Sequence, residues 1–169
     1  GLQAQFSGTL GASNHGGVTV HIASSDPSRL KVAPDLTSQG QDFIDVSVAN
    51  GSTAFSYVLQ GTDWGVGSTA TPVTITASAP GFANGSNVVN YVQPALRLSG
   101  VPLTTTALSL NSDIEVEIGI PTAGNTNLNV LQQRRAFGSD LTATITNSNA
   151  AVAELDLNGG GAGMQVQTA

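Results

Sequence analysis

Apolar and polar residues alternate in short runs along most of the chain, and this pattern predicts β-strands. The clearest run is 18–32, VTVHIASSDPSRLKV, in which the alternation extends from Val18 to Ile22. The stretch 24–28 interrupts it as a corner, because Asp and Ser side chains bond the nearby backbone and proline fixes φ. The alternation resumes at Leu30. The run therefore predicts a strand, a polar corner and a second strand.

A second copy of this design lies at 141–155, LTATITNSNAAVAEL. Ile145 corresponds to Ile22, and Ser148 in the polar corner corresponds to Ser25. Two copies of one strand–corner–strand unit predict two related β modules. Charged residues make up only 9% of the chain, whereas surface helices are normally rich in long charged side chains. The predicted fold class is therefore all-β.

The first module, 1–93, contains seven predicted strands. They are centred on residues 2–6, 18–22, 30–32, 43–48, 55–59, 73–77 and 88–92. Asn50-Gly51 predicts a hairpin, because both residues tolerate positive φ. Seven short strands separated by frequent turns predict a β-sandwich. Six residues on apolar strand faces are expected inside it: Ile22, Val46, Phe55, Tyr57, Val73 and Ile75.

The second module, 94–162, begins within a short, stiff linker, 93–95, that contains Pro94. Strands are predicted at 96–98, 108–110 and 114–118, and the stretch 128–137 fits either a strand or a helical turn. After its strand–corner–strand copy, this module lacks the later strands of the first. We therefore expect it to be short or incomplete, with open sheet edges.

The two ends of the chain carry similar sequences. The chain begins GLQAQFS and ends GMQVQTA, so the two segments start at residues 1 and 163 and imply a repeat of 162 residues. A period this long indicates a tandem array of domains. We expect 163–169 either to continue covalently into the next repeat or to insert into the next subunit by strand addition. The assembly strands are expected to use five alternating residues: Leu2, Ala4, Phe6, Met164 and Val166.

Composition and charge exclude several classes of partner. The 169 residues carry a formal net charge of −6 with only five Lys and Arg, so binding to nucleic acid through phosphate neutralisation is not expected. No apolar run approaches the roughly 18 residues that a membrane-spanning helix needs, so membrane insertion is not expected. The chain has no cysteine, which excludes disulfides and most zinc sites.

Four runs carry a resemblance to a known family: GGVTVHIASSDPSRLKVAP, NGSTAFSYVLQG, VTITASAPGFANGSNVV and LTATITNSNAAVAEL. They resemble bacterial immunoglobulin-like repeats of large secreted or surface proteins, of the adhesin or filament type. The resemblance covers most of 1–92 and, more loosely, 96–157. It implies two immunoglobulin-like β-sandwich modules in tandem, an extracellular or cell-surface location, and a role as a stalk or filament. The family carries no catalytic residues, so none transfer to this chain.

The residues that could carry chemistry do not form a known motif. His15 and His21 are the only histidines, and no Gly-x-Ser-x-Gly sequence is present, so a catalytic triad is not expected. Asp113, Glu115 and Glu117 share one face of a predicted strand, where carboxylates are candidate calcium ligands. We favour a solvated outer face, because residues two apart on a strand diverge from a single ion. We therefore predict no enzyme activity, no cofactor and no metal site.

Three further residues are candidates for sugar binding or attachment. Trp64 is the only tryptophan and lies in the predicted loop 62–71; such a residue either stacks on sugar rings or, more often, packs at the end of a sandwich. Asn50 and Asn84 each begin an Asn-Gly-Ser sequence that fits N-glycosylation. Asn-Gly is also a common turn dipeptide, and that alone accounts for both sites.

These observations predict a structural extracellular protein that is a subunit or repeat of a surface filament or adhesin stalk. Its expected partners are copies of itself, assembled head-to-tail through β-strand pairing, and glycans are a second candidate partner. The alternative is a carbohydrate-binding or accessory β module of a secreted enzyme. Trp64, Tyr57 and Tyr91 are the candidate aromatic residues for that alternative.

Overall fold

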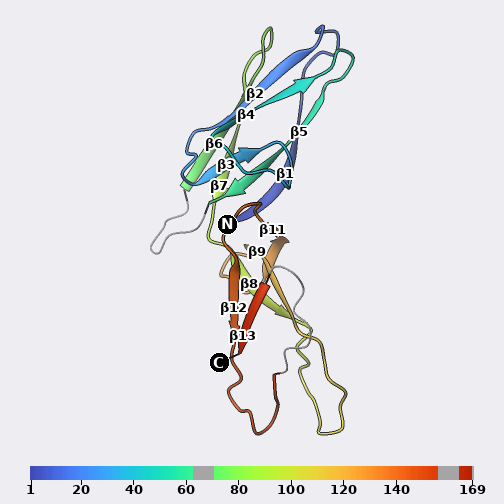
Figure 1. Cartoon of the computed structure of the whole chain (residues 1–169), viewed down its shortest axis with the longest axis vertical. Helices are drawn as coiled ribbons and strands as arrows, with labels where there is room; N and C mark the ends of the chain where they lie inside the picture. Colours follow the sequence, from blue (N-terminus) through green and yellow to red (C-terminus); the bar gives the residue numbers. More distant parts are fainter. Residues whose placement is uncertain (63–70, 156–163, 169) are drawn as a thin grey trace. The chain divides into compact units, whose positions relative to one another are not determined.

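The computed structural model describes residues 1–62, 71–155 and 164–168. These residues form strands, turns and bends without a helix, so the predicted all-β class is confirmed (Figure 1). The strands are β1 (Leu2–Thr9), β2 (Val18–Ser24), β3 (Leu30–Ala33), β4 (Phe43–Val48), β5 (Ala54–Gly61), β6 (Thr71–Ser78), β7 (Gly85–Tyr91), β8 (Ala95–Ser99), β9 (Glu115–Pro121), β10 (Leu128–Leu131), β11 (Gln133–Arg134), β12 (Leu141–Ile145) and β13 (Met164–Thr168).

The chain divides into two compact units, Gly1–Gly138 and Ser139–Ala169. The predicted module boundary after residue 93 falls inside the first unit. The modules 1–93 and 94–162 therefore stay predictions. None of the described residues lies in a helix long and apolar enough to cross a membrane.

Two four-stranded sheets enclose the main core of the first unit. One has the strand order β4-β2-β6-β7 and the other β11-β1-β5-β3, and every pairing within them is antiparallel. Apolar side chains from both sheets join one buried cluster. Alternation places one face of each strand inward, so two such sheets cover each other in a sandwich-like arrangement.

The core contains the interior residues that the alternation predicts. Three of the six are buried: Ile22, Val73 and Ile75. The other three are partly buried against the same cluster: Val46, Phe55 and Tyr57. The prediction omitted Val20, which is 1% exposed, and Val58, which is fully buried. Strict alternation misses Val58 because three consecutive residues of β5, 58–60, are all buried.

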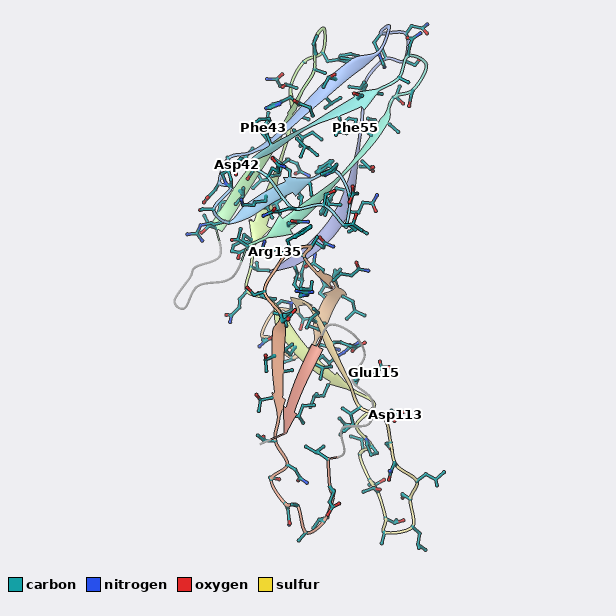
Figure 2. All side chains as sticks on the ribbon, in the orientation of Figure 1. Asp42, Phe43, Phe55, Asp113, Glu115 and Arg135 are labelled. Atoms are coloured by element: carbon teal, nitrogen blue, oxygen red, sulfur yellow. The ribbon has the colours of Figure 1, made fainter. Side chains whose placement is uncertain are left out.

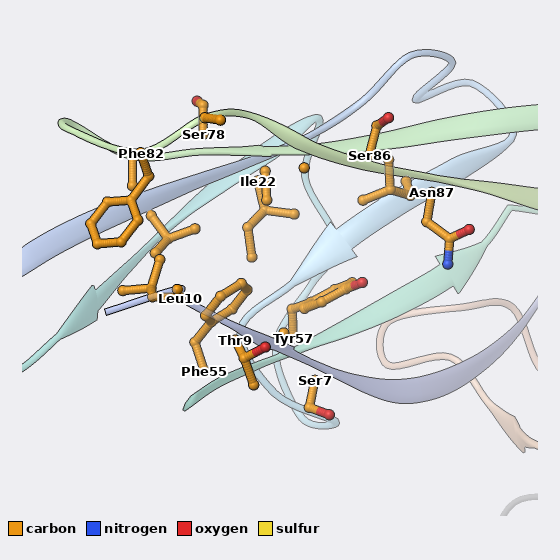
Figure 3. Close-up of a pocket in the computed structure, with 18 residues that line it drawn as sticks. Ser7, Thr9, Leu10, Ile22, Phe55, Tyr57, Ser78, Phe82, Ser86 and Asn87 are labelled. Atoms are coloured by element: carbon orange, nitrogen blue, oxygen red, sulfur yellow. The ribbon is translucent and has the colours of Figure 1, made fainter. Parts of the chain in front are cut away.

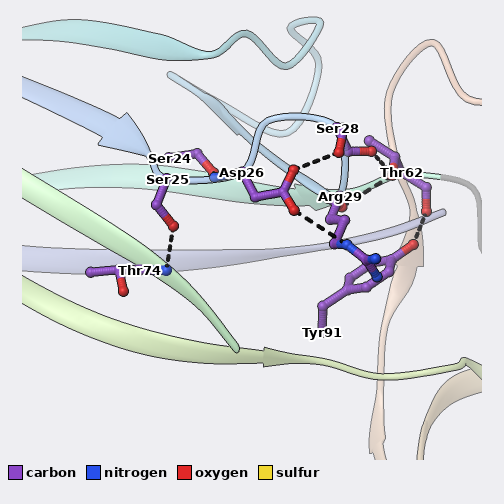
Figure 4. A network of polar contacts seen from close by, with 8 residues as sticks. All are labelled: Ser24, Ser25, Asp26, Ser28, Arg29, Thr62, Thr74 and Tyr91. Carbon is purple, nitrogen blue, oxygen red and sulfur yellow. Dashed lines mark hydrogen bonds and ion pairs between the residues drawn. The ribbon is translucent and has the colours of Figure 1, made fainter. Parts of the chain in front are cut away.

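The predicted polar corner after β2 carries the chain from one sheet to the other (Figure 4). Its centre is Asp26, whose backbone carbonyl accepts hydrogen bonds from the amides of Arg29 and Leu30 at 3.1 and 3.0 Å. The Asp26 carboxylate also pairs with Arg29 Nε at 3.2 Å. Ser25 Oγ accepts a hydrogen bond from the Thr74 amide at 2.9 Å. The corner is thus fixed both locally and to β6.

The hairpin predicted at Asn50-Gly51 is wrong, although a turn is present. Gly51 has a φ of +90°, and the Ser52 amide donates to the Ala49 carbonyl at 3.0 Å. The strands on either side, β4 and β5, belong to different sheets. An Asn-Gly pair specifies only the local backbone, whereas the partner of each strand is decided by where its apolar face finds cover.

A three-stranded antiparallel sheet with the order β10-β9-β8 completes the first unit. It contains the strands predicted at 96–98 and 114–118. Arg97 Nε donates to Glu117 Oε2 at 2.6 Å, and this contact raises the pKa of Arg97. Leu98 remains 48% exposed. The described residues do not close this sheet into a second sandwich.

Two strand predictions in this part of the chain are wrong. The residues 108–110 form a turn and a bend, with Leu108 and Leu110 at 95% and 92% exposure. The residues 151–155 also contain no strand, so β12 is the one strand that the second strand–corner–strand copy forms within its described residues. A short apolar alternation does not hold a strand without a partner strand and a covered face.

The second unit contains a parallel strand pair. β12 runs beside β13, from Leu141 opposite Met164 to Ile145 opposite Thr168. The segment 164–168 is therefore extended. Its pairing partner in this structure is a strand of the same chain.

Candidate assembly site

The two lateral edges of the sandwich differ. At the edge formed by β3 and β4, Val32 and Gln41 exchange both backbone hydrogen bonds, at 2.8 and 2.7 Å, and so tie the two sheets together. At the opposite edge, β7 and most of β1 are the outer strands. A cavity of about 300 Å³ opens between them. This open edge is the candidate site.

Residues of both sheets line the cavity (Figure 3). Phe55 and Tyr57 lie on one side, Phe82 and Ser86 lie on the other, and Ile22 lies between them. All the lining side chains are uncharged. Burial raises the pKa of the Tyr57 phenol. Because burying an unpaired charge is costly, the cavity favours a neutral partner.

The strand β1 has a neighbour on both sides only at its beginning. Leu2 and Gln3 pair with β11, whereas the whole stretch from Gln3 to Thr9 pairs with β5. From Ala4 onward, no other described strand covers the second edge of β1. Phe6 on this stretch is 42% exposed. An uncovered strand edge is a template for another strand.

A row of aromatic rings supports this exposed part of β1. Phe6 stacks on Tyr57 with ring centroids 6.0 Å apart, and Tyr57 stacks on Phe55 at 6.4 Å. A Cβ at Gly8 would lie 2.2 Å from the Phe55 ring. Glycine at this position therefore lets Phe55 lie against the backbone of β1. Part of the Phe6 side chain stays exposed and is available to a partner.

Two buried glutamines fasten the start of β1 to β5. Gln3 is 5% exposed and Gln60 is 1% exposed. Gln60 Nε2 donates to Gln3 Oε1 and to the Ser38 carbonyl, both at 2.9 Å, and Gln60 Oε1 accepts from the Gly40 amide at 2.8 Å. Gln3 Nε2 donates to the Leu36 carbonyl at 2.9 Å, and its Oε1 also accepts from a backbone amide after β11 at 3.0 Å. A side-chain amide is needed here because it both donates and accepts.

The turn around Asp35 holds the two carbonyls that receive these glutamines. Asp35 Oδ1 accepts hydrogen bonds from the amides of Thr37 and Ser38, both at 2.8 Å, and from the Thr37 hydroxyl at 2.7 Å. Asp35 Oδ2 accepts from the Ser38 hydroxyl at 2.9 Å. These donors, led by the Thr37 hydroxyl, lower the pKa of Asp35 to about 2. The turn therefore keeps its geometry while the carboxylate is ionised.

The residue before β1 has no room for a side chain. A Cβ at Gly1 would lie 1.8 Å from the backbone carbonyl oxygen of Gly61. The Gly1 carbonyl accepts a hydrogen bond from the Arg135 amide at 3.0 Å, and Leu2 is only 8% exposed. The start of β1 therefore requires three residues in succession: a glycine (Gly1), a buried apolar residue (Leu2) and a residue with a buried side-chain amide (Gln3).

The five predicted assembly residues lie in two strands of different pairing. Leu2 is buried, Ala4 is half-buried and Phe6 is exposed on β1. Met164 and Val166 belong to β13, where they lie opposite Leu141 and Ala143 of β12. Their role in assembly stays a prediction.

The candidate sugar sites show no common surface feature. Trp64 lies outside the described residues. Asn50 and Asn84 are both exposed, and Asn50 Oδ1 accepts a hydrogen bond from the Gly16 amide at 2.8 Å. A glycan on Asn50 would have to replace or accommodate that contact. Sugar attachment at both asparagines stays a prediction.

The two histidines hold structural contacts, and the predicted acidic strand face lies only partly on a strand. His21 Nδ1 lies 2.8 Å from Asp45 Oδ1, and both side chains are about half exposed. His15 Nε2 lies 2.9 Å from a backbone carbonyl. Asp113 precedes β9 and Glu115 begins it (Figure 2). Among the described residues, no three His, Asp or Glu side chains are placed to hold one metal ion.

No protein-family model, curated protein or solved structure matches this chain. The resemblance to bacterial immunoglobulin-like repeats therefore rests on the sequence runs alone.

The buried glutamine pair is the feature that sequence reasoning missed. Alternation placed Gln3 on the polar face of the first strand, and nothing singled out Gln60. The recurrence of this glutamine at Gln165 does not signal burial, because Gln5, which is exposed, recurs in the same way at Gln167.

Proposed function

We propose that the chain is a structural subunit or repeat that assembles head-to-tail with copies of itself through β-strand pairing. The observation that carries this proposal is the coincidence of two features. The strand β1 has an uncovered edge beside an uncharged cavity. The chain also contains a second segment, GMQVQTA, with the sequence character of β1 itself.

Strand pairing supplies affinity through main-chain hydrogen bonds and specificity through alternate side chains. The segment 164–168, MQVQT, is uncharged, which suits the uncharged lining of the cavity. A contact between a C-terminal segment and an N-terminal strand is heterologous. Such contacts propagate into filaments unless the rotation between copies closes a ring.

The location and family belong to the same proposal. We infer an extracellular or cell-surface filament or adhesin stalk built from immunoglobulin-like modules. The support is the sequence resemblance, together with a chain rich in Thr, Ser and Asn and free of cysteine. No contact among the described residues favours the alternative of a carbohydrate-binding module.

Removal of the C-terminal segment tests the proposal. The wild-type chain and a variant lacking 163–169 are compared by sedimentation velocity over a wide concentration range. We expect concentration-dependent oligomers from the wild type and folded monomers from the variant, checked by circular dichroism. Equal association of both chains, or a wild type that stays monomeric throughout, would contradict head-to-tail assembly through this segment.

A further inference from the structure

We infer that the position of β1 is itself the receiving site, and that the segment 163–169 of a second copy replaces β1 there by strand exchange. This inference rests on the proposed assembly and names its acceptor. The alternative within the same proposal is addition of a strand at the uncovered edge without displacement of β1.

The first support is the glycine requirement. The backbone of Gly61 leaves no space for a Cβ at residue 1, because that atom would lie 1.8 Å from the Gly61 carbonyl oxygen. The C-terminal segment carries glycine at the corresponding position, Gly163. Most residue types would clash there, so this match is a steric condition that an arbitrary strand does not meet.

The second support is the pair of residues that follows. Leu2 is buried and corresponds to Met164, which has a similar volume and an adaptable side chain. Gln3 is buried in the network with Gln60 and corresponds to Gln165. A strand with an apolar residue at this position would remove one partner of Gln60 and would leave the Leu36 carbonyl and the backbone amide after β11 without the hydrogen bonds that Gln3 makes.

The backbone ladders make exchange feasible. A segment of seven residues in the place of 1–7 would form five antiparallel pairs with β5, from Gln60 to Ser56, and two with β11. In this structure β13 forms five parallel pairs with β12, and parallel pairing is slightly less stable per residue. The incoming segment would gain these seven pairs but give up its five with β12, and the displaced β1 would lose its own pairs, so exchange depends on a high concentration of the chain.

Exchange predicts opposite effects for equivalent substitutions in the two strands. Gln165→Ala weakens the incoming strand and should raise the apparent dissociation constant of the full-length chain about tenfold or more. Gln3→Ala weakens the resident strand and should lower that constant. Gln5→Ala and Gln167→Ala are the matched controls, because Gln5 is exposed, and both should leave association near the wild-type value.

The outcomes separate this inference from the proposed function. If Gln3→Ala and Gln165→Ala shift association in the same direction, or if Gln165→Ala behaves like Gln167→Ala, exchange is excluded. Loss of association on removal of 163–169 would still support head-to-tail assembly in that case. A wild-type chain that never associates would overturn the proposed function.

A second measurement, the melting temperature of single-chain variants, tests the receiving site independently of assembly. The double variant Leu2→Met/Ala4→Val converts the start of β1 into GMQVQ, the start of the C-terminal segment. We expect it to fold and to melt close to the wild type, whereas the same variant with Gln3→Ala added should melt several degrees lower. An unfolded double variant, or no further loss on adding Gln3→Ala, would overturn the inference.

Discussion

The sandwich and the three-stranded sheet β10-β9-β8 are built from the same kind of alternating strand, yet only the sandwich buries its apolar side chains well. Val73 and Ile75 of β6 are 0% and 4% exposed, whereas Leu96 and Leu98 of β8 are 59% and 48% exposed. The difference is a facing sheet: β6 lies across the core from β5 and β3, as the shared cluster shows. Alternation creates an apolar face, but burial needs a second apolar face to cover it.

The same comparison applies to the two edges of the sandwich. The edge at β3 and β4 is closed by the bridge between Val32 and Gln41. The edge at β1 and β7 opens onto the uncharged cavity. A closed edge contributes to stability alone, whereas an open edge leaves backbone groups and apolar surface for a partner.

The largest expected effect on the free energy of unfolding comes from a substitution in the sandwich core. Ile75→Ala should lower the free energy of unfolding by about 2–5 kcal/mol, because it removes buried apolar surface and leaves a cavity. The matched control is Leu110→Ala in the exposed loop, which should change it by less than about 0.5 kcal/mol. Urea unfolding followed by circular dichroism measures both. Equal effects would mean that Ile75 and Leu110 do not differ in how much their burial stabilises the fold.

An intermediate effect is expected at the glutamine pair. Gln60→Ala should cost about 1–3 kcal/mol, since it leaves the Gly40 amide and the Ser38 carbonyl unsatisfied in a buried place and removes one donor to Gln3 Oε1. Gln5→Ala, on the exposed face of β1, should be close to neutral. The same unfolding measurement applies, and a Gln60→Ala variant as stable as Gln5→Ala would show that the network is not holding β1.

The smallest expected effect concerns the turn at Asp35. Its pKa in the folded chain, about 2, lies below the value of roughly 3.9 in an unfolded chain. The ionised carboxylate therefore contributes stability fully above about pH 4, and this contribution is lost as the pH falls toward 2. Asp35→Asn should show a weaker dependence of unfolding free energy on pH between 4 and 2. Parallel pH profiles for the variant and the wild type would contradict this role.

Much of the sandwich could be predicted from the sequence because its strands are amphipathic and bounded by strong turn residues. The strand–corner–strand unit around Asp26 is an example, since its corner chemistry is local. The wrong predictions concern segments whose structure depends on pairing with residues far away in the sequence. Asn50-Gly51 turns the chain, but the sheet of the next strand is not specified by this turn. Leu108 lies in an apolar alternation, but none of the described strands pairs with it.

The candidate site was predicted only in part. The similarity of the two ends pointed to Leu2 and Met164 as equivalent residues, and β1 and β13 are both strands. The sequence could not reveal that Gln3 is buried, because its burial depends on Gln60 and on the carbonyl of Leu36. Long-range polar contacts leave no periodic signal in the chain.

The most direct test of the account is a disulfide trap for the incoming strand. Ser7 lies opposite Ser56 in the ladder between β1 and β5, and Ala169 corresponds to Ser7 in the C-terminal segment. The chain has no cysteine, so Ser56→Cys/Ala169→Cys introduces the only thiols. Under mild oxidation we expect a ladder of covalent oligomers on a non-reducing gel.

The control for this trap is Ser47→Cys/Ala169→Cys, which places the first thiol at an exposed position on β4 of the other sheet. We expect this pair to stay predominantly monomeric under the same conditions. Equal crosslinking of the two pairs, or an internal disulfide within single chains of Ser56→Cys/Ala169→Cys, would contradict replacement of β1 by the strand of a second copy.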